Sequence, residues 1–264
     1  MDVEKILRKM IRAAWCCLPK GKRVPLIRAV IHQAGADEQR SIGVTSLGAG
    51  LSQLRGNGFL PNSVIDVGAN RGNWTLETQS VFPSASFVLV DADPANDAFL
   101  AQVCSSRPHC KYFITLLGAE SRDGIRFYQM GTGSSVLSER SLADRNELSL
   151  RMNTLDDLVA AEVKSPILLK LDVQGYELEV LRGAVKTLSE AEVVIIECSL
   201  IQYNEGAPLV AEVVSFMGER GFVVYDFCGH MRRASDGALF QIDVIFVREG
   251  SRLRKEFDRW IAKG

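Results

Sequence analysis

The sequence predicts an α/β fold built on a doubly wound, mostly parallel β-sheet. Three observations lead to this prediction. From residue 63 onward, short apolar runs alternate with amphipathic stretches, a glycine-containing turn follows the first run, and acidic residues end several of them. Such alternation is typical of right-handed βαβ crossovers, in which each helix returns the chain to the next parallel strand. A chain of 264 residues is long enough to bury one large core.

The residues that precede the sheet are expected to form an N-terminal helical extension over residues 1–60. Apolar side chains near the start of the chain recur at helical spacing, with Lys and Arg between them. A basic amphipathic helix usually packs on its own domain or a partner subunit, and peripheral membrane contact through residues 1–18 is the alternative. A second apolar segment covers residues 24–31, and residues 47–58 predict a third helix that ends at glycines.

The core domain is expected over residues 61–250. Short apolar runs predict buried strands at residues 63–67, 86–91, 111–117, 167–172 and 192–197. Amphipathic stretches predict helices at residues 74–82, 95–104, 177–188 and 209–220. Two last strand candidates, residues 222–227 and 240–247, flank a Ser-Asp-Gly turn, which predicts a closing antiparallel hairpin. The expected sheet therefore has seven strands, and a C-terminal helix is expected over residues 251–264.

One interval breaks the alternation of strands and helices. Between Gly118 and Asn153, residues 125–130 predict a strand, and the Gly-Thr-Gly-Ser-Ser segment after it predicts a flexible loop. We interpret this interval as an inserted hairpin and loop that overhang the carboxyl edge of the sheet. Ser134 and Ser135 of the loop are therefore candidate substrate-binding residues.

Charge and hydropathy limit the partners of the protein. The 31 Lys and Arg residues almost balance the 32 Asp and Glu residues, so the whole surface has no field that attracts nucleic acid or an anionic membrane. No apolar stretch reaches the roughly 20 residues that a transmembrane helix needs. The apolar run near the amino terminus is too short for a secretory signal. We therefore expect a cytoplasmic protein with no nucleic-acid partner.

The six cysteines favour buried, unreactive thiols and no metal site. None forms a C-x-x-C pair, and no pair of histidines at zinc-ligand spacing lies near them. Several fall within apolar runs, where cysteine acts as a small buried hydrophobe. The cysteines are Cys16, Cys17, Cys104, Cys110, Cys198 and Cys228.

The sharpest motif is VIDVGANRGNW, residues 64–74, where the first strand turns into the first helix. Gly68 and Gly72 let the backbone turn tightly and approach a ligand, and the following helix directs its amides and positive dipole there. Asp66 can hold a cationic group or order the amides of the loop. The stretch lacks the G-x-G-x-x-G pattern of a dinucleotide site. It suits a ligand with a positive amine and a sulfonium better than a pyrophosphate.

Acidic residues end two further strands at the same edge of the sheet. Asp91 ends the second strand, where a carboxylate can accept hydrogen bonds from both ribose hydroxyls of a nucleoside. Asp93 is the second choice and can equally cap the helix that opens at Pro94. Asp172 ends the fourth strand and needs a partner there, either a cofactor amine, a metal or a substrate hydroxyl. Glu177 either stabilises the first turn of the next helix or takes part in the chemistry.

Six segments together resemble the FkbM-type methyltransferases in order and spacing, over roughly residues 45–247. They are VIDVGANRGNWT, FVLVDADP, TLDDL, LLKLDVQGYELEVLRGA, VVIIE and DVIFV. The aspartate–glycine–asparagine loop is shared with many methyltransferases, whereas the LKxDVxGxExxxLxGA stretch is more particular to this family. Two positions depart from the family pattern. Gln174 stands where the family commonly has an acid, which removes a candidate base or metal ligand, and Asp91 stands where it often has glutamate.

The resemblance implies a Rossmann-like class I methyltransferase fold that binds S-adenosylmethionine. The implied acceptors are hydroxyls of a glycan, a sugar or a polyketide-like natural product. The implied cofactor-binding residues lie in the glycine loop and at two strand ends, and they are Asp66, Gly68, Ala69, Asn70, Gly72, Asp91 and Asp172.

A hydroxyl acceptor benefits from a general base, and the sequence offers three candidates. Asp172 and Glu197, which follows the fifth strand, are the catalytic candidates, and His230 lies in a predicted loop. His32 and His109 are expected far from the carboxyl edge of the sheet.

Two other classes of function compete with methyl transfer. An NAD(P)-dependent oxidoreductase is opposed by the incomplete dinucleotide fingerprint and by the lack of a Tyr-x-x-x-Lys relay. A non-catalytic nucleotide-binding Rossmann-like protein could act through its helical amino terminus. A nucleic-acid methyltransferase is a weaker third alternative, because the chain is slightly acidic and has no N-P-P-Y-like motif.

Overall fold

The computed structural model of the protein describes residues 46–105, 107, 109–139 and 145–254. Most of the predicted N-terminal extension, with the segment 1–18, lies outside the described residues. Cys16, Cys17, His32 and nearly all of the predicted C-terminal helix lie outside them as well.

The centre of the fold is a seven-stranded sheet with the strand order β3-β2-β1-β7-β8-β10-β9. Five strands run parallel to one another: β1 (Ser63–Val67), β2 (Ser86–Asp91), β3 (Cys110–Ile114), β7 (Ile167–Leu171) and β8 (Ala191–Ser199). The strand β10 (Leu239–Arg248) pairs antiparallel with both β8 and β9 (Phe222–Arg232). This arrangement confirms the predicted Rossmann-like class I sheet with its closing hairpin.

The strand order reverses between β1 and β7, which lie side by side. The chain runs from β1 outward through β2 to β3 and then returns to the other side of β1. In open α/β sheets, ligands bind in the crevice beyond the carboxyl ends of the strands at such a reversal. The fold therefore marks the region after Val67 and Leu171 as the candidate site.

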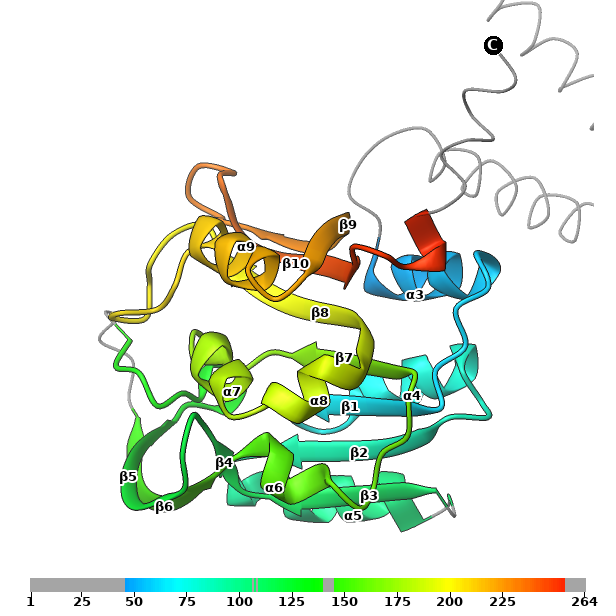
Figure 1. The fold of residues 1–264 in the computed structure, drawn as a ribbon. Coiled ribbons are helices and arrows are strands. Elements are labelled where there is room, and N and C mark those ends of the chain that lie inside the picture. The colour runs from blue at the N-terminus through cyan, green and yellow to red at the C-terminus, as the bar shows by residue number, and fades with distance from the viewer. Residues whose placement is uncertain (1–45, 106, 108, 140–144, 255–264) are drawn as a thin grey trace, which may run out of the picture. The chain divides into compact units, whose positions relative to one another are not determined.

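Helices cover both faces of the sheet (Figure 1). On one face, α3 (Leu47–Gly56), α4 (Asn73–Val81) and α5 (Asp97–Ser105) enclose one hydrophobic core. On the other face, α6 (Leu155–Val159), α7 (Glu177–Arg182), α8 (Val185–Glu190) and α9 (Val210–Gly218) enclose a second. Because both faces are covered, β1 and β7 are buried at every position, which explains why their sequences are almost continuously apolar.

Helix α3 belongs to this packed unit, although the sequence analysis assigned it to the extension. Leu51 and Leu54 of α3 are fully buried in the same core as Leu100 of α5 and Ile245 of β10.

Among the described residues, no helix is long and apolar enough to cross a membrane.

The interval between β3 and β7 forms a small second sheet. It contains β4 (Leu116–Leu117), β5 (Arg122–Gln129) and β6 (Asn146–Asn153) in the order β4-β6-β5, with β5 and β6 antiparallel. The inserted hairpin is therefore confirmed, with the short helix η2 (Gly131–Gly133) after β5. The single strand predicted over residues 111–117 is wrong, because β3 ends at Ile114 and β4 pairs with β6 instead.

Two predicted helices are each divided. The helix expected over residues 95–104 begins with a 3-10 turn, η1 (Pro94–Asn96), before α5. The helix expected over residues 177–188 consists of α7 and α8, which are separated at Gly183. A Cβ at Gly183 would lie 2.1 Å from the carbonyl oxygen of Gly118, so this glycine lets the start of the small sheet pack closely. The sequence analysis missed α6, whose first turn is capped by the Thr154 hydroxyl.

Two predictions outside the core are wrong. Cys104 and Cys110 form a disulfide, because the connection from α5 to β3 brings their Cα atoms to 4.9 Å. Cys198 and Cys228 are buried thiols, as predicted. His230 lies in β9, opposite Ile242, and not in a loop, because the hairpin strands extend beyond their predicted ends.

Candidate active site

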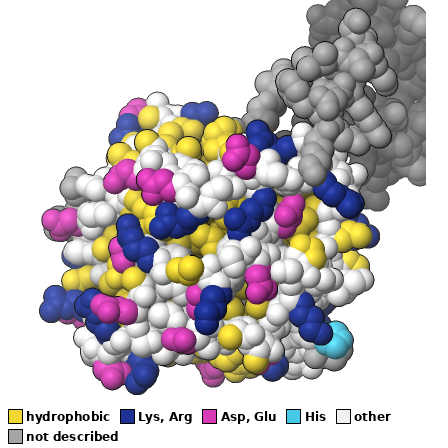
Figure 2. All heavy atoms as spheres, in the orientation of Figure 1, with side chains coloured by type: hydrophobic (Ala, Val, Ile, Leu, Met, Phe, Trp, Pro, Cys, Tyr) yellow, Lys and Arg dark blue, Asp and Glu magenta, His cyan; other side chains and the backbone are white. Residues whose placement is uncertain are grey.

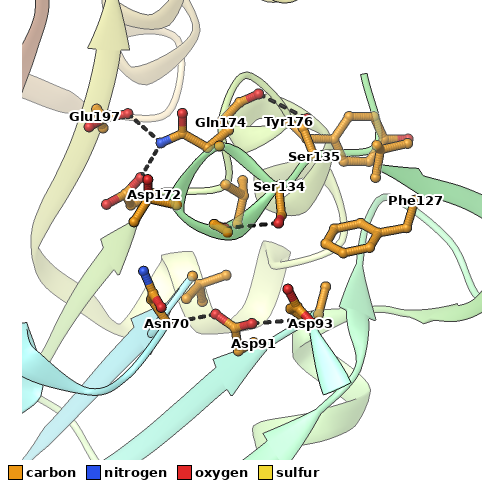
Figure 3. A pocket seen from close by; sticks show the side chains of 18 of the residues that line it. Asn70, Asp91, Asp93, Phe127, Ser134, Ser135, Asp172, Gln174, Tyr176 and Glu197 are labelled. Carbon is orange, nitrogen blue, oxygen red and sulfur yellow. Dashed lines mark hydrogen bonds between the residues drawn. The ribbon is translucent and has the colours of Figure 1, made fainter. Parts of the chain in front are cut away.

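A cavity of about 610 Å³ lies at the carboxyl edge of the sheet, at the reversal of strand order. Its walls come from the connections after β1, β2, β3 and β7, from the η2 loop, and from β8 and the β9–β10 hairpin. Two groups of polar side chains face each other across it (Figure 3). We call them the β1–β2 wall, made of Asn70, Asp91 and Asp93, and the β7–β8 wall, made of Asp172, Gln174 and Glu197.

The glycine-containing loop after β1 is held against its neighbours by its own backbone. The amides of Gly68 and Ala69 both donate to the carbonyl oxygen of Val90, at 2.9 and 3.1 Å. Gly68 has φ of 78°, and a Cβ there would lie 1.8 Å from the carbonyl oxygen of Asp172. Gly72 has φ of 77°, and a Cβ there would meet Val103 of α5 at 2.9 Å. Only glycine allows this loop to approach both β7 and α5 so closely.

Asp91 orders the loops of the β1–β2 wall. Its carboxylate accepts hydrogen bonds from the amide of Asn70 at 2.6 Å, the amide of Asp93 at 2.9 Å and the side chain of Asn96 at 3.0 Å. Burial raises the pKa of Asp91, and these hydrogen bonds oppose that rise. Because a carboxylate has about four acceptor positions, one position on Oδ2 remains for a ligand hydroxyl.

Asp93 joins the inserted hairpin to the same wall. Its Oδ1 caps η1 by accepting from the amide of Ala95 at 2.9 Å, and it accepts from the side chain of Gln129 in β5 at 2.6 Å. Its Oδ2 makes no hydrogen bond within the described part of the chain. Asp93 therefore caps a helix, as one alternative of the sequence analysis has it, and also keeps a free carboxylate oxygen beside the cavity.

Asp66 lies behind the cavity and not in its lining. It is fully buried, accepts a hydrogen bond from the Thr75 hydroxyl at 2.7 Å, and lies 3.5 Å from the ammonium of Lys170. Burial raises the pKa of Asp66, and the charge of Lys170 opposes this. The side chain thus fixes α4 and Lys170. Ala69 and Gly72, the other predicted cofactor-binding residues outside the lining, belong to the same turn.

Lys170 connects the buried carboxylate to the cavity. Its ammonium lies between Asp66 and Asp172, 3.2 Å from the Asp172 carboxylate, and 5.5 Å from the ring centre of Trp74. Burial alone would lower the pKa of Lys170, but the charges of Asp172 and Asp66 raise it overall. The sequence analysis missed Lys170. Its position inside the apolar run of a predicted buried strand could have indicated a buried ion pair, since a buried charge requires partners.

The β7–β8 wall is organised around the side-chain amide of Gln174 (Figure 3). This nitrogen donates to the carboxyl groups of Asp172 and Glu197, each at 2.8 Å. The hydroxyl of Tyr203 donates to the amide oxygen of Gln174. Glu197 also accepts from the side chain of Gln241 in β10 at 2.7 Å. Residues far apart in the sequence therefore meet at one hydrogen-bond network.

The backbone of Gln174 is held in an uncommon conformation. Its φ is 56°, in the left-handed region that non-glycine residues rarely adopt. Its carbonyl oxygen accepts from the Ser135 hydroxyl at 3.0 Å and from the Asn204 side chain at 2.7 Å. These bonds, which come from the insert and from the connection after β8, fix the direction of the Gln174 side chain.

Ser134 and Ser135 both line the cavity, and both hydroxyls form hydrogen bonds to backbone groups. Ser134 accepts from the amide of Met130 and donates to the carbonyl oxygen of Gly131, each at 2.8 Å. Ser135 is nearly fully buried and donates to Gln174, as described above.

The remaining candidates of the sequence analysis are not part of the cavity lining. Glu177 is buried at the start of α7 and accepts from the amides of Val173 and Gly175, at 3.0 and 3.1 Å. This places it in the first helical turn. His230 and His109 are not part of the cavity lining. In the described residues, no group of three or more His, Cys, Asp or Glu side chains is arranged to hold a metal ion.

Comparison with known families identifies the domain that carries this cavity. The profile described as "Methyltransferase FkbM domain" matches residues 66–224. The chain belongs to this family. Every carboxylate of the two walls lies within the matched segment, whereas Gln241 lies beyond it in the closing hairpin. The FkbM domain therefore includes both walls, and the hairpin adds to them.

Several solved methyltransferase structures are similar to this chain. A precorrin-6y C5,15-methyltransferase from Geobacter metallireducens GS-15 is 11% identical, with 76% of this chain and 87% of that chain covered and a TM-score of 0.42. The N-methyltransferase NodS from Bradyrhizobium japonicum WM9 is 9% identical, with 76% and 93% covered and a TM-score of 0.44. The mitomycin 7-O-methyltransferase MmcR is 11% identical, with 76% and 53% covered and a TM-score of 0.40. No curated protein sequence matches the chain significantly.

Proposed function

We propose that this FkbM-family protein transfers a methyl group from S-adenosylmethionine to a hydroxyl of a sugar, a glycan or a natural product. One observation carries the proposal. Two sets of carboxyl groups of the FkbM domain face each other across one cavity of about 610 Å³. In this proposal, the β1–β2 wall binds the nucleoside of the cofactor, and the β7–β8 wall binds the acceptor.

The charges of the cavity fit a cationic cofactor. Its described lining includes the carboxylates of Asp91, Asp93, Glu139 and Asp172. The lining also includes Arg233, which forms an ion pair with Asp236. A sulfonium and an ammonium are favoured by such an excess of carboxyl groups, whereas the pyrophosphate of a dinucleotide is repelled. This argues against the NAD(P)-dependent oxidoreductase.

The β1–β2 wall can bind a nucleoside. Asp91 and Asp93 both keep acceptor positions for ribose hydroxyls, and neighbouring backbone amides hold both carboxylates in place. Asn70, at the tip of the loop, has φ of 49° and lines the cavity.

On the β7–β8 wall, Asp172 is the proposed general base. Its side chain is 30% exposed, it lines the cavity, and its carboxylate is paired with the ammonium of Lys170 at 3.2 Å. Bound S-adenosylmethionine supplies an electrophilic methyl group, so the protein has to position the acceptor hydroxyl and take its proton. General-base catalysis of this kind contributes about 10²- to 10⁴-fold to a rate.

The aromatic part of the cavity lining suits a ring-shaped acceptor. Tyr203 and Phe240 pack edge to face there, with ring centres 5.9 Å apart, and Ile201 and Met231 add apolar surface. Aromatic and apolar walls with a few polar groups are typical of small-molecule sites.

We also propose that the predicted methyltransferase domain, residues 61–250, includes α3 as well.

We further propose that the acceptor is not a nucleic acid. On the face drawn in Figure 2, basic and acidic side chains are interspersed, and neither sign forms a large continuous patch. A nucleic-acid enzyme would need a basic stripe to follow a phosphate backbone.

Calorimetric titration with S-adenosylmethionine, S-adenosylhomocysteine and NADH tests the proposed cofactor. The first two are expected to bind, and Asp91→Ala should weaken both by about ten- to a hundredfold, since a hydrogen bond to a charged group is worth about 1.5–3 kcal/mol. Asp123→Ala, which removes an exposed carboxylate of β5, is the matched control and should bind like the wild type. Binding of NADH alone would support the oxidoreductase, and no binding at all would support the non-catalytic alternative.

A further inference from the structure

The two carboxyl oxygens of Glu197 have different surroundings. Oε1 accepts hydrogen bonds from the side-chain amides of Gln174 at 2.8 Å and Gln241 at 2.7 Å. Amide nitrogens only donate, so both acceptor positions of Oε1 are filled. Oε2 makes no hydrogen bond within the described part of the chain, and Glu197 lines the cavity. A proton on Glu197 therefore belongs on Oε2.

The orientation of the Gln174 amide is fixed by its neighbours. Its nitrogen lies beside two carboxyl groups, and its oxygen accepts from the Tyr203 hydroxyl. The reverse orientation would place the amide oxygen against both carboxyl groups, where it could not donate.

The charges around Glu197 favour its neutral form. The charges of Asp172, which follows β7, Asp243 in β10 and Glu177 in α7 all disfavour a negative charge on it. The hydroxyl of Tyr203 lies in the same hydrogen-bond network. Lys170 opposes them, but its ammonium is already shared between Asp66 and Asp172. Burial, together with these carboxyl groups, raises the pKa of Glu197 to about 9.

We propose that Glu197 acts as a neutral carboxylic acid, whose Oε2 hydroxyl donates a hydrogen bond to an oxygen of the acceptor next to the hydroxyl that is methylated. This inference rests on the proposed function and assigns a role to Glu197 that differs from that of a base. As the acceptor oxygen gains the methyl group, the sulfonium sulfur keeps the electron pair of the broken bond. The acceptor proton passes to Asp172, and Glu197 keeps its own proton.

The geometry also defines the class of acceptor. Asp172 Oδ1 and Glu197 Oε1 both lie 2.8 Å from the same nitrogen of Gln174, so the two carboxyl groups flank one position of the cavity, and we infer that they contact oxygens on adjacent carbon atoms. The acceptor is therefore a 1,2-diol, or a hydroxyl beside an ether or carbonyl oxygen. Gln174 is a positioning residue here, because an acid at this position would have no N–H group for the two carboxyl groups.

Infrared spectroscopy of the full chain labelled with ¹³C at the glutamate carboxyl carbon tests the protonation of Glu197. Burial raises the pKa of Glu177 to about 7, so the spectra are compared at pH 8, where Glu177 is largely ionised. The wild type should show a protonated glutamate band at this pH that disappears with a midpoint near pH 9 and shifts in D₂O. The band should be absent from Glu197→Gln and present in Glu192→Gln, the control on the same strand. No such band in the wild type at pH 8 would overturn the proposal, and this result needs no folded variant.

The acceptor class is tested with cis-1,2-cyclohexanediol and cyclohexanol as probes. The diol accepts the hydrogen bond of Glu197 while Asp172 holds its other hydroxyl, so the diol should raise the pH at which the band disappears, and cyclohexanol should raise it less. Equal shifts, or no shift with the diol, would overturn the acceptor class. Neither readout requires S-adenosylmethionine, so a failure here is distinct from a failure of cofactor binding in the calorimetric test.

Discussion

The two walls of the cavity are built in different ways. In the β1–β2 wall, Asp91 accepts hydrogen bonds from Asn70, Asp93 and Asn96, which lie within 21 residues of it in the sequence. In the β7–β8 wall, Glu197 accepts from Gln174 and Gln241, which are 23 and 44 residues away. A wall made by local turns keeps one geometry, which suits the proposed role of the β1–β2 wall in binding the cofactor. A wall assembled from distant segments can vary with the acceptor.

The largest effect is expected for a substitution in the β7–β8 wall. Asp172→Asn removes the proposed base but keeps the shape of the side chain, so methyl transfer should fall by about 10²- to 10⁴-fold. The measurement is transfer of a labelled methyl group to a panel of sugars and natural-product alcohols, with cofactor affinity determined in parallel. Activity within about tenfold of the wild type would remove Asp172 from the role of base.

The next largest effect is expected where the glycine-containing loop approaches the backbone of Asp172. Gly68→Ala places a Cβ 1.8 Å from the carbonyl oxygen of Asp172 at a φ of 78°, and we expect a loss of about 2–4 kcal/mol in the free energy of unfolding. Gly237→Ala is the matched control, because its φ of 72° is similar but its Cβ meets nothing within 4 Å. The control should lose only about 1–2 kcal/mol. Urea unfolding measures both, and equal losses would contradict the close approach.

The difference between the walls also explains what the sequence could predict. The fold class, the position of the glycine loop, and the strand-end acids Asp91 and Asp172 follow from local patterns of apolar runs and turn residues. Such patterns depend on neighbours in the sequence, so they can be recognised without a structure.

The other site residues and the disulfide depend on tertiary contacts that no local sequence pattern encodes. Tyr203 and Gln241 enter the site from the connection after β8 and from β10, and both lie outside the six segments that resemble the family. Asp91 is the last residue of β2, but Asp66 lies one residue before the end of β1, and its side chain contacts Lys170 and not the cavity. The disulfide of Cys104 and Cys110 likewise depends on how α5 returns to β3.

A third prediction concerns how the stability contributed by Glu197 in the β7–β8 wall depends on pH. The pKa of Glu197 is about 9 in the folded protein against 4.5 as its ordinary value. Its contribution to stability is therefore full below pH 4.5 and is lost as the pH rises toward 9. Glu197→Gln cannot titrate, so its melting temperature relative to the wild type should increase steadily over this range. A constant difference between the two proteins would contradict the neutral carboxyl group.

The smallest expected effect concerns the link between the insert and the β1–β2 wall. Gln129→Leu removes the 2.6 Å hydrogen bond to Asp93 and should lower the free energy of unfolding by about 1 kcal/mol. Affinity for S-adenosylhomocysteine should fall only a few-fold, because Asp91 keeps its own hydrogen bonds. Urea unfolding and calorimetry measure the two effects. A loss of affinity as large as that of Asp91→Ala would show that the insert belongs to the cofactor side.

The most direct test of the division between the two walls is calorimetric titration of Asp91→Ala and Glu197→Gln with S-adenosylhomocysteine, side by side. The account predicts that Asp91→Ala binds it about ten- to a hundredfold more weakly than the wild type. Glu197→Gln, which keeps the acceptor and donor of the neutral acid, should bind it with unchanged affinity. Equal weakening in both variants, or wild-type affinity in Asp91→Ala, would contradict the assignment of the cofactor to the β1–β2 wall.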